Sequence, residues 1–212
     1  MTLEKAVSKA LAGPEVLLVE DDVALSGYLA ASLRSHGFSV QTAGDRASAL
    51  ACIDKPTPPA LILLDLGLPP QPSTMREGLL VLKDALRLAP GTKVLVLTGQ
   101  DEAAAAHEAV RLGAFDFLNK PVTLEAVLQA LRRADLFSRQ EARMALGGEA
   151  RLNIVTRLAE GPKEAGAQAE ELLVRRSFAA SGYNVTEVAR QLGLSRENVY
   201  YYLHKYGIRR PD

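Results

Sequence analysis

Between residues 15 and 137, short apolar runs alternate five times with segments of helical periodicity. This alternation is typical of a parallel sheet with helices on both of its faces. We therefore predict an α/β fold with a doubly wound, five-stranded parallel sheet. The predicted strands lie near residues 15–20, 38–42, 60–65, 93–97 and 115–118.

Capping residues set the predicted helix bounds. Asp22 and Asp45 precede two helical patterns and can accept hydrogen bonds from first-turn amides. Gly37 and Gly113 can close helices in the left-handed conformation. The helices between strands are predicted to end near 36, 54, 88 and 112, with the fourth starting at Asp101. A last helix, capped by Thr123, has an apolar stripe that continues towards Leu146 and makes it a rod leaving the domain; Gly147 and Gly148 end it.

Residues 138–168 are predicted to be a helical extension and linker, with some helix at 151–160 and no Gly-rich phosphate-binding loop of an ATPase. Residues 169–212, the tail, are predicted to form a small all-α domain of three helices. The first covers Glu170–Ala180, Asn184 and Glu187 form a capping box before the second, and Ser195 caps the third. A helix, a short turn with Gly193 and a helix is the pattern of a helix-turn-helix.

Charge and hydropathy limit the function classes. The 25 basic residues balance the 25 acidic ones, but residues 14–137 are acidic (11 Lys+Arg, 15 Asp+Glu) and residues 169–212 are mildly basic (7 against 5). This asymmetry indicates two parts with different partners. Residues 1–13 lack the apolar core of a secretory signal, and no run reaches the roughly 18 apolar residues of a membrane helix. We expect a cytoplasmic protein without a membrane partner.

Polar residues follow four of the predicted strands. These are Glu20 and Asp21, Asp65, Thr98 and Lys120. The carboxyl ends of parallel strands meet at one edge of a sheet, where ligands bind. Taken singly, adjacent acids are more typical of a helix N-terminus, and a lone Thr or Lys of a turn or the surface. Together they predict one site whose carboxylates bind the hard cation Mg²⁺.

In this order, the residues resemble the site of the receiver domain of bacterial two-component response regulators, over residues 14–137. The resemblance implies a flavodoxin-like fold in which Asp65 accepts a phosphoryl group from a sensor histidine kinase. The implied Mg²⁺ ligands are Asp21, Asp65 and the carbonyl of Gly67, with Glu20 acting through water. Lys120 is implied to pair with the phosphoryl group, and Thr98 and Phe117 to form the switch.

Such a protein is no enzyme beyond slow self-dephosphorylation. A phosphohydrolase that uses Asp65 as its nucleophile would place a second acid two residues later, where this chain has Gly67. Residues 69–78 are about four residues longer than the usual loop here, and their prolines predict a stiff loop beside the site.

Residues 184–208 resemble a Fis-type helix-turn-helix, with apolar residues at its core positions. The resemblance implies DNA binding by a homodimer joined through Glu170–Ala180. The expected DNA contacts are Arg196, Asn198, Tyr201, Tyr202 and Lys205. The alternative is a phosphorelay or protein-interaction regulator whose tail dimerises without reading DNA.

Overall fold

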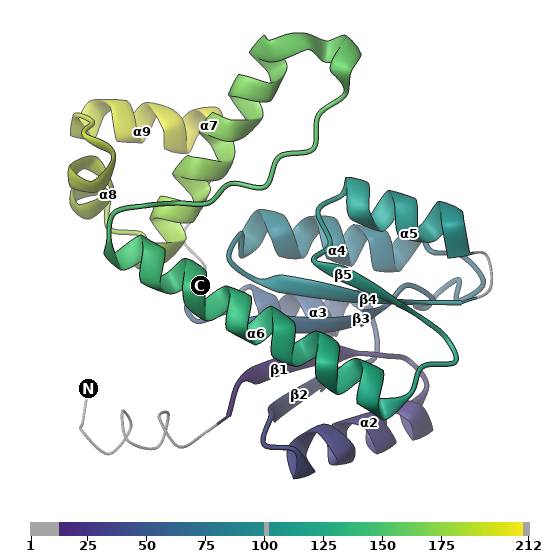
Figure 1. Cartoon of the computed structure of the whole chain (residues 1–212). Coiled ribbons are helices and arrows are strands. Elements are labelled where there is room, and N and C mark those ends of the chain that lie inside the picture. Colours follow the sequence, from purple (N-terminus) through teal and green to yellow (C-terminus); the bar gives the residue numbers. More distant parts are fainter. Residues whose placement is uncertain (1–12, 100–101, 210–212) are drawn as a thin grey trace.

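The computed structural model describes residues 13–99 and 102–209. Five parallel strands form one sheet in the order β2-β1-β3-β4-β5 (Figure 1). The strands are β1 (Glu15–Val19), β2 (Ser39–Ala43), β3 (Leu61–Asp65), β4 (Lys93–Thr98) and β5 (Asp116–Asn119). Each bound lies within one residue of its predicted position, so the predicted α/β fold with a doubly wound sheet is confirmed.

Helices cover both faces of the sheet. Alternate strand residues point to opposite faces, so Leu17 and Ile62 pack in one core and Leu18 and Leu63 in the other. The first core is closed by α3 (Arg46–Ile53), α4 (Arg76–Leu88) and α5 (Glu102–Arg111), and the second by α2 (Val23–Ser35) and α6 (Leu124–Leu146). Since β3 is buried on both faces, its sequence is apolar without a break until Asp65.

The predicted caps are present. The Asp22 carboxylate accepts hydrogen bonds from the amides of Ala24 and Leu25, and Asp45 forms a capping box with Ser48. Gly37 and Gly113 have φ of +89° and +98°, a region that glycine enters without steric cost. Asp101, the expected start of α5, lies outside the described residues. The same holds for residues 1–12, which belong to the segment predicted to lack a secretory signal.

The linker differs from the prediction. Residues 151–157 form no helix, and only a 3-10 turn, η1 (Leu158–Glu160), lies in the segment expected to be helical. Helix α7 (Gly161–Ala180) begins nine residues before Glu170. Pro162 explains the early start, because its fixed φ and missing N–H suit the first turn of a helix. Ala, Glu and Gln residues then favour helix up to Glu170.

The tail contains α7, α8 (Val185–Leu192) and α9 (Arg196–Lys205), which pack around Val174, Phe178, Val188 and Val199. Gly193 adopts the left-handed conformation between α8 and α9, and Ser195 caps α9, as predicted. The capping box at α8 is only half formed: Asn184 accepts two amide hydrogen bonds, but the Glu187 carboxylate accepts from Arg190 and Gln191 instead. No helix in the described part of the chain is long and apolar enough to cross a membrane.

Candidate functional site

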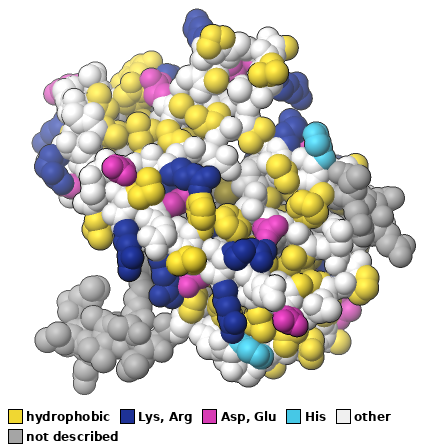
Figure 2. Space-filling model, viewed as in Figure 1, with side chains coloured by type: hydrophobic (Ala, Val, Ile, Leu, Met, Phe, Trp, Pro, Cys, Tyr) yellow, Lys and Arg dark blue, Asp and Glu magenta, His cyan; other side chains and the backbone are white. Residues whose placement is uncertain are grey.

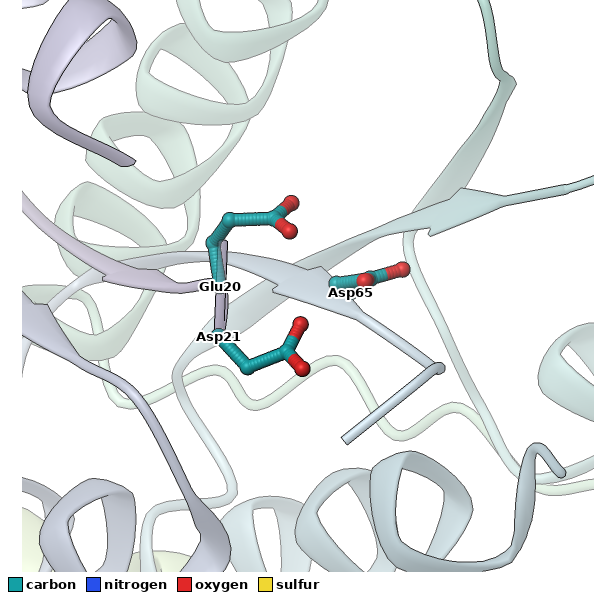
Figure 3. Close-up of side chains that lie close together, drawn as sticks. All are labelled: Glu20, Asp21 and Asp65. Atoms are coloured by element: carbon teal, nitrogen blue, oxygen red, sulfur yellow. The ribbon is translucent and has the colours of Figure 1, made fainter. Parts of the chain in front are cut away.

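Three carboxylates meet at the carboxyl edge of the sheet. Strands β1 and β3 pair in parallel and end together, which brings Glu20 and Asp21 beside Asp65. Carboxylate oxygens of all three lie within 4.8 Å of one another, and the side chains turn towards a common space (Figure 3). Glu20 and Asp65 are buried and Asp21 is half-buried. Asp22 lies outside this group as the cap of α2, which was its predicted role.

Lys120 reaches into the same space from the end of β5. Its Nζ lies 2.9 Å from Oε2 of Glu20 and 3.0 Å from Oδ2 of Asp65. The peptide bond between Lys120 and Pro121 is cis. Burial opposes the charge of the ammonium, but its contacts with Glu20 and Asp65 outweigh burial and raise the pKa of Lys120.

The charges in the site do not balance. Burial, helped by the nearby Asp65, raises the pKa of Glu20 although Lys120 donates a hydrogen bond to it. The ammonium of Lys120 contacts two carboxylates, whereas the buried Glu20 carboxylate shares this one ammonium with Asp65. Oxygen donors with excess negative charge fit Mg²⁺, which binds few carboxylates and keeps several waters. The residues present therefore suit this ion.

Thr98 and Phe117 occupy different surroundings. Thr98, at the end of β4, is buried, lines the site and donates a hydrogen bond of 3.4 Å to Oδ1 of Asn119. The Phe117 residue on β5 is 38% exposed and does not line the site. Sequence reasoning did not find Asn119, because it is one polar residue at a strand end with no spacing signal.

The loop before α4 forms one wall of the site. Pro72, Ser73, Thr74 and Met75 line a cavity of 660 Å³ together with the acidic cluster, Gly67 and Lys120. The carbonyl of Pro72 lies 2.8 Å from the point that a Cβ on Gly67 would occupy. The predicted position of this loop beside the site is thus confirmed. The sequence did not indicate a role for Gly78. A Cβ at this position would lie 2.3 Å from the Leu66 Cα.

The tail presents a second candidate surface on α9. Arg196, Asn198 and Tyr201 are exposed there. Lys205 is exposed as well, and Tyr202 is half-buried. Both contact Glu170 on α7, with distances of 3.2 Å from the Tyr202 hydroxyl and 2.5 Å from Lys205 Nζ. Tyr206 also donates to Glu170 and stacks on Tyr202. These hydrogen bonds lower the pKa of Glu170, Lys205 foremost.

The cations are dispersed on the face seen in Figure 2. Lys and Arg side chains (dark blue) are spread over the domain and the tail with Asp and Glu (magenta) between them. A surface of this kind attracts nucleic acid only weakly over long distances, so close contacts on α9 would have to supply affinity.

Known proteins match the N-terminal part of the chain. The family model described as "Response regulator receiver domain" matches residues 16–132. Acid tolerance regulatory protein ActR of Rhizobium meliloti (strain 1021) is 35% identical over 128 residues, which cover 59% of this chain and 63% of ActR. Nitrogen assimilation regulatory protein NtrX of Azorhizobium caulinodans is 34% identical over 120 residues, 57% of this chain and 26% of NtrX.

Solved structures agree with the fold. The crystal structure of the receiver domain of NtrX from Brucella abortus superposes with a TM-score of 0.51 and 32% identity. The match covers 56% of this chain and 96% of that one. In ActR and NtrX the match spans less than two thirds of each relative's own length.

Proposed function

The chain belongs to the response regulator receiver domain family, and from this premise we propose that Asp65 accepts a phosphoryl group and thereby controls DNA binding by the tail. A receiver domain implies a sensor histidine kinase as the donor. The observation that carries the proposal is the position of Asp65, buried at the end of β3, 3.0 Å from Lys120 and within 4.8 Å of Glu20 and Asp21.

The side chains divide the chemistry. An oxygen of Asp65 forms the new P–O bond as the P–N bond to the donor's histidine breaks, and the leaving imidazole keeps the electron pair and takes up a proton. Glu20, Asp21, Asp65 and the Gly67 carbonyl would hold Mg²⁺, which reduces the repulsion between carboxylate and phosphate when bound. Lys120 is placed to pair with the transferred group as a point charge. The family acts as a switch, so turnover would be limited to slow self-dephosphorylation.

The signal would pass through Thr98 and Phe117. We expect the Thr98 hydroxyl to leave Asn119 and donate to the phosphoryl oxygens, opening space into which the exposed Phe117 ring turns. Such a two-state element can change the surface that the domain presents to partners. The helix-turn-helix geometry of α8 and α9 supports DNA as the output, read by a homodimer through Arg196, Asn198 and Tyr201.

A phosphorylation assay tests the input. Incubation with Mg²⁺ and acetyl phosphate is expected to place one phosphate on the parent chain, detected by intact-mass spectrometry, and none on Asp65→Asn. Asp22→Asn is the matched control, because it changes the neighbouring acid outside the cluster and Asn remains a good helix cap. Equal labelling of Asp65→Asn would refute Asp65 as the acceptor.

DNA binding is tested with fragments selected from random sequence by the phosphorylated protein. Arg196→Ala should weaken specific binding by about 1–3 kcal/mol, as for a lost base contact. For Lys205→Ala the salt dependence is informative: if Lys205 leaves Glu170 for a phosphate, the slope of log affinity against log salt falls by about one. Failure to select any sequence would refute DNA as the output.

One observation favours a second candidate function. Glu170 holds Tyr202 and Lys205, two of the five expected DNA contacts, inside the tail. A tail in which Lys205 is paired with Glu170 suits a regulator that dimerises or binds proteins without reading DNA. Sedimentation of the chain with and without acetyl phosphate distinguishes the two: a phosphorylation-dependent dimer without selectable DNA supports this candidate.

A further inference from the structure

A cavity of 560 Å³ lies between the sheet and the tail, at the end of the sheet opposite to Asp65. Its walls include the start of β4, the segment before β5 and the C-terminal half of α4. They also include α6, the linker at Arg151 and Asn153, and α7. The phosphoryl-acceptor site and the α9 surface do not contribute to it.

The walls of this cleft carry excess positive charge. Six cations line it but only two acids do: Lys83, Arg87, Lys93, Arg151, Arg175 and Arg176 against Glu141 and Glu171. Glu141 pairs with both Lys93 and Arg176, and Glu171 with Arg175. Arg87 lies 3.5 Å from Asp84 outside the cleft. Among the described residues, Lys83 and Arg151 form no ion pair.

The same walls are largely apolar. Leu86, Leu112, Phe115, Phe137 and Leu172 line the cleft, and the rings of Phe115 and Phe137 are 5.4 Å apart. Arg151 lies over the Phe137 ring at 4.5 Å. Apolar walls of low dielectric strengthen the field of unpaired cations. The cleft is therefore complementary to a ligand that has both an apolar body and negative charge.

We propose that this cleft binds a nucleotide-sized organic phosphate, with its apolar part against the Phe and Leu side chains and its phosphates near Lys83 and Arg151. The volume lies within the range of about 300–1,000 Å³ of small-molecule sites, which often occur between domains. Because both the sheet and α7 form the walls, a bound ligand stabilises the arrangement in which tail and domain are together. This inference is independent of the proposed phosphorylation and DNA binding.

Calorimetric titration of the full chain tests the proposal. The probes are ATP, AMP, adenosine and pyrophosphate in magnesium-free buffer, so that no metal–nucleotide complex forms at the acidic site. At least one nucleotide is expected to bind at one site, about tenfold or more tightly than adenosine and pyrophosphate. Asp65→Asn should bind equally well. Absence of nucleotide binding at millimolar concentration, or pyrophosphate binding as tightly as ATP, would overturn the proposal.

Three variants locate the binding. Lys83→Ala and Arg151→Ala should each weaken the nucleotide by about tenfold, because each removes an unpaired cation from the wall. Arg132→Ala is the matched control, since Arg132 is an exposed cation on α6 outside the cleft, and should leave binding unchanged. Unaltered affinity in both cleft variants, with unchanged melting temperatures, would also overturn the assignment.

Discussion

At the scale of single residues, Lys120 is the one cation among the three carboxylates of the site in the described part of the chain. The two acids it contacts, Glu20 and Asp65, are both buried, so its removal leaves like charges facing each other with little access to water. Removal of Lys120 should therefore lower the stability of the metal-free chain and raise its affinity for Mg²⁺.

Lys120→Gln is expected to destabilise the metal-free chain by about 3 kcal/mol, the low end for breaking a buried ion pair, because the Lys120 side chain is 26% exposed. The same change should raise Mg²⁺ affinity, since a competing cation is lost. Urea unfolding with and without Mg²⁺ measures both effects. Lys163→Gln, an exposed lysine on α7, should change neither. Weaker Mg²⁺ binding by Lys120→Gln would contradict the charge argument.

Gly78, near the start of α4, packs closely against the backbone of Asp65 and Leu66 at the end of β3. An added Cβ would lie 2.3 Å from the Leu66 Cα, and backbone atoms cannot move aside as a side-chain tip can. We expect Gly78→Ala to cost about 1–3 kcal/mol or more. Gly91→Ala, where nothing lies within 4 Å of the new Cβ, should stay within about 0.5 kcal/mol of the parent. Equal denaturation midpoints for the two variants would refute this role.

At the scale of elements, the tail depends on caps because its core is small. Five apolar residues are buried in the cluster that joins α7, α8 and α9. The Asn184 side chain satisfies two of the free amides at the start of α8, at 3.0 and 3.2 Å. Asn184→Ala should therefore destabilise the tail by about 1 kcal/mol, whereas Asn184→Ser, which retains an acceptor, should cost less. Chemical unfolding followed by circular dichroism compares them; equal losses would argue against the cap.

The elements also show why the contacts of Tyr202 and Lys205 on α9 with Glu170 were not predicted. Residues three, four or seven positions apart share a helix face, which predicted that Tyr202 and Lys205 accompany Asn198 on the exposed surface. Their contact with Glu170 spans more than 30 positions and depends on how α7 crosses α9. Helical periodicity carries no information on such a crossing.

At the scale of the whole molecule, a buried ionic group joins domain and tail. Glu141 on α6 lies 2.7 Å from Lys93 on β4 and 2.9 Å from Arg176 on α7, with 9% of its side chain exposed. Burial opposes the charge of Glu141, but the hydrogen bonds and charges of Lys93 and Arg176 outweigh it and lower the pKa. A buried carboxylate of this kind is uncommon unless paired.

Glu141→Gln should loosen the contact between domain and tail by about 1–2 kcal/mol, because it removes the charge shared by two cations. Cleavage of the exposed linker by a protease should then become about 5–30-fold faster. Glu164→Gln, an exposed acid on α7, is the control and should leave the rate unchanged. Unchanged cleavage of Glu141→Gln would show that other contacts hold the tail.

The pH dependence of this contact follows from the lowered pKa. The stabilisation is complete above the unfolded-state pKa of Glu, about 4.3, and is lost as the pH falls through the lower folded-state value. The radius of gyration from small-angle X-ray scattering should therefore increase on acidification below about pH 4 in the parent and not in Glu141→Gln. An expansion that starts near neutral pH would contradict this origin.

Much of the fold and of the acidic site could be predicted because their signals are local. Each strand is a short apolar run, and Asp65, Thr98 and Lys120 lie at strand ends, so a parallel sheet brings them together whatever the helices do. The start of α7 was predicted wrongly, although Pro162 supplied a local signal for it.

The sheet, its two buried faces and the residues that meet at its carboxyl edge follow from the amino-acid sequence alone, because hydrophobic period and strand ends are properties of neighbouring residues. Packing of the helices, in contrast, sets the burial of Glu141 between Lys93 and Arg176, the pairing of Glu170 with Lys205, and the cationic cleft beneath the tail. These contacts join residues 35 to 48 positions apart, and their formation depends on the packing of whole helices.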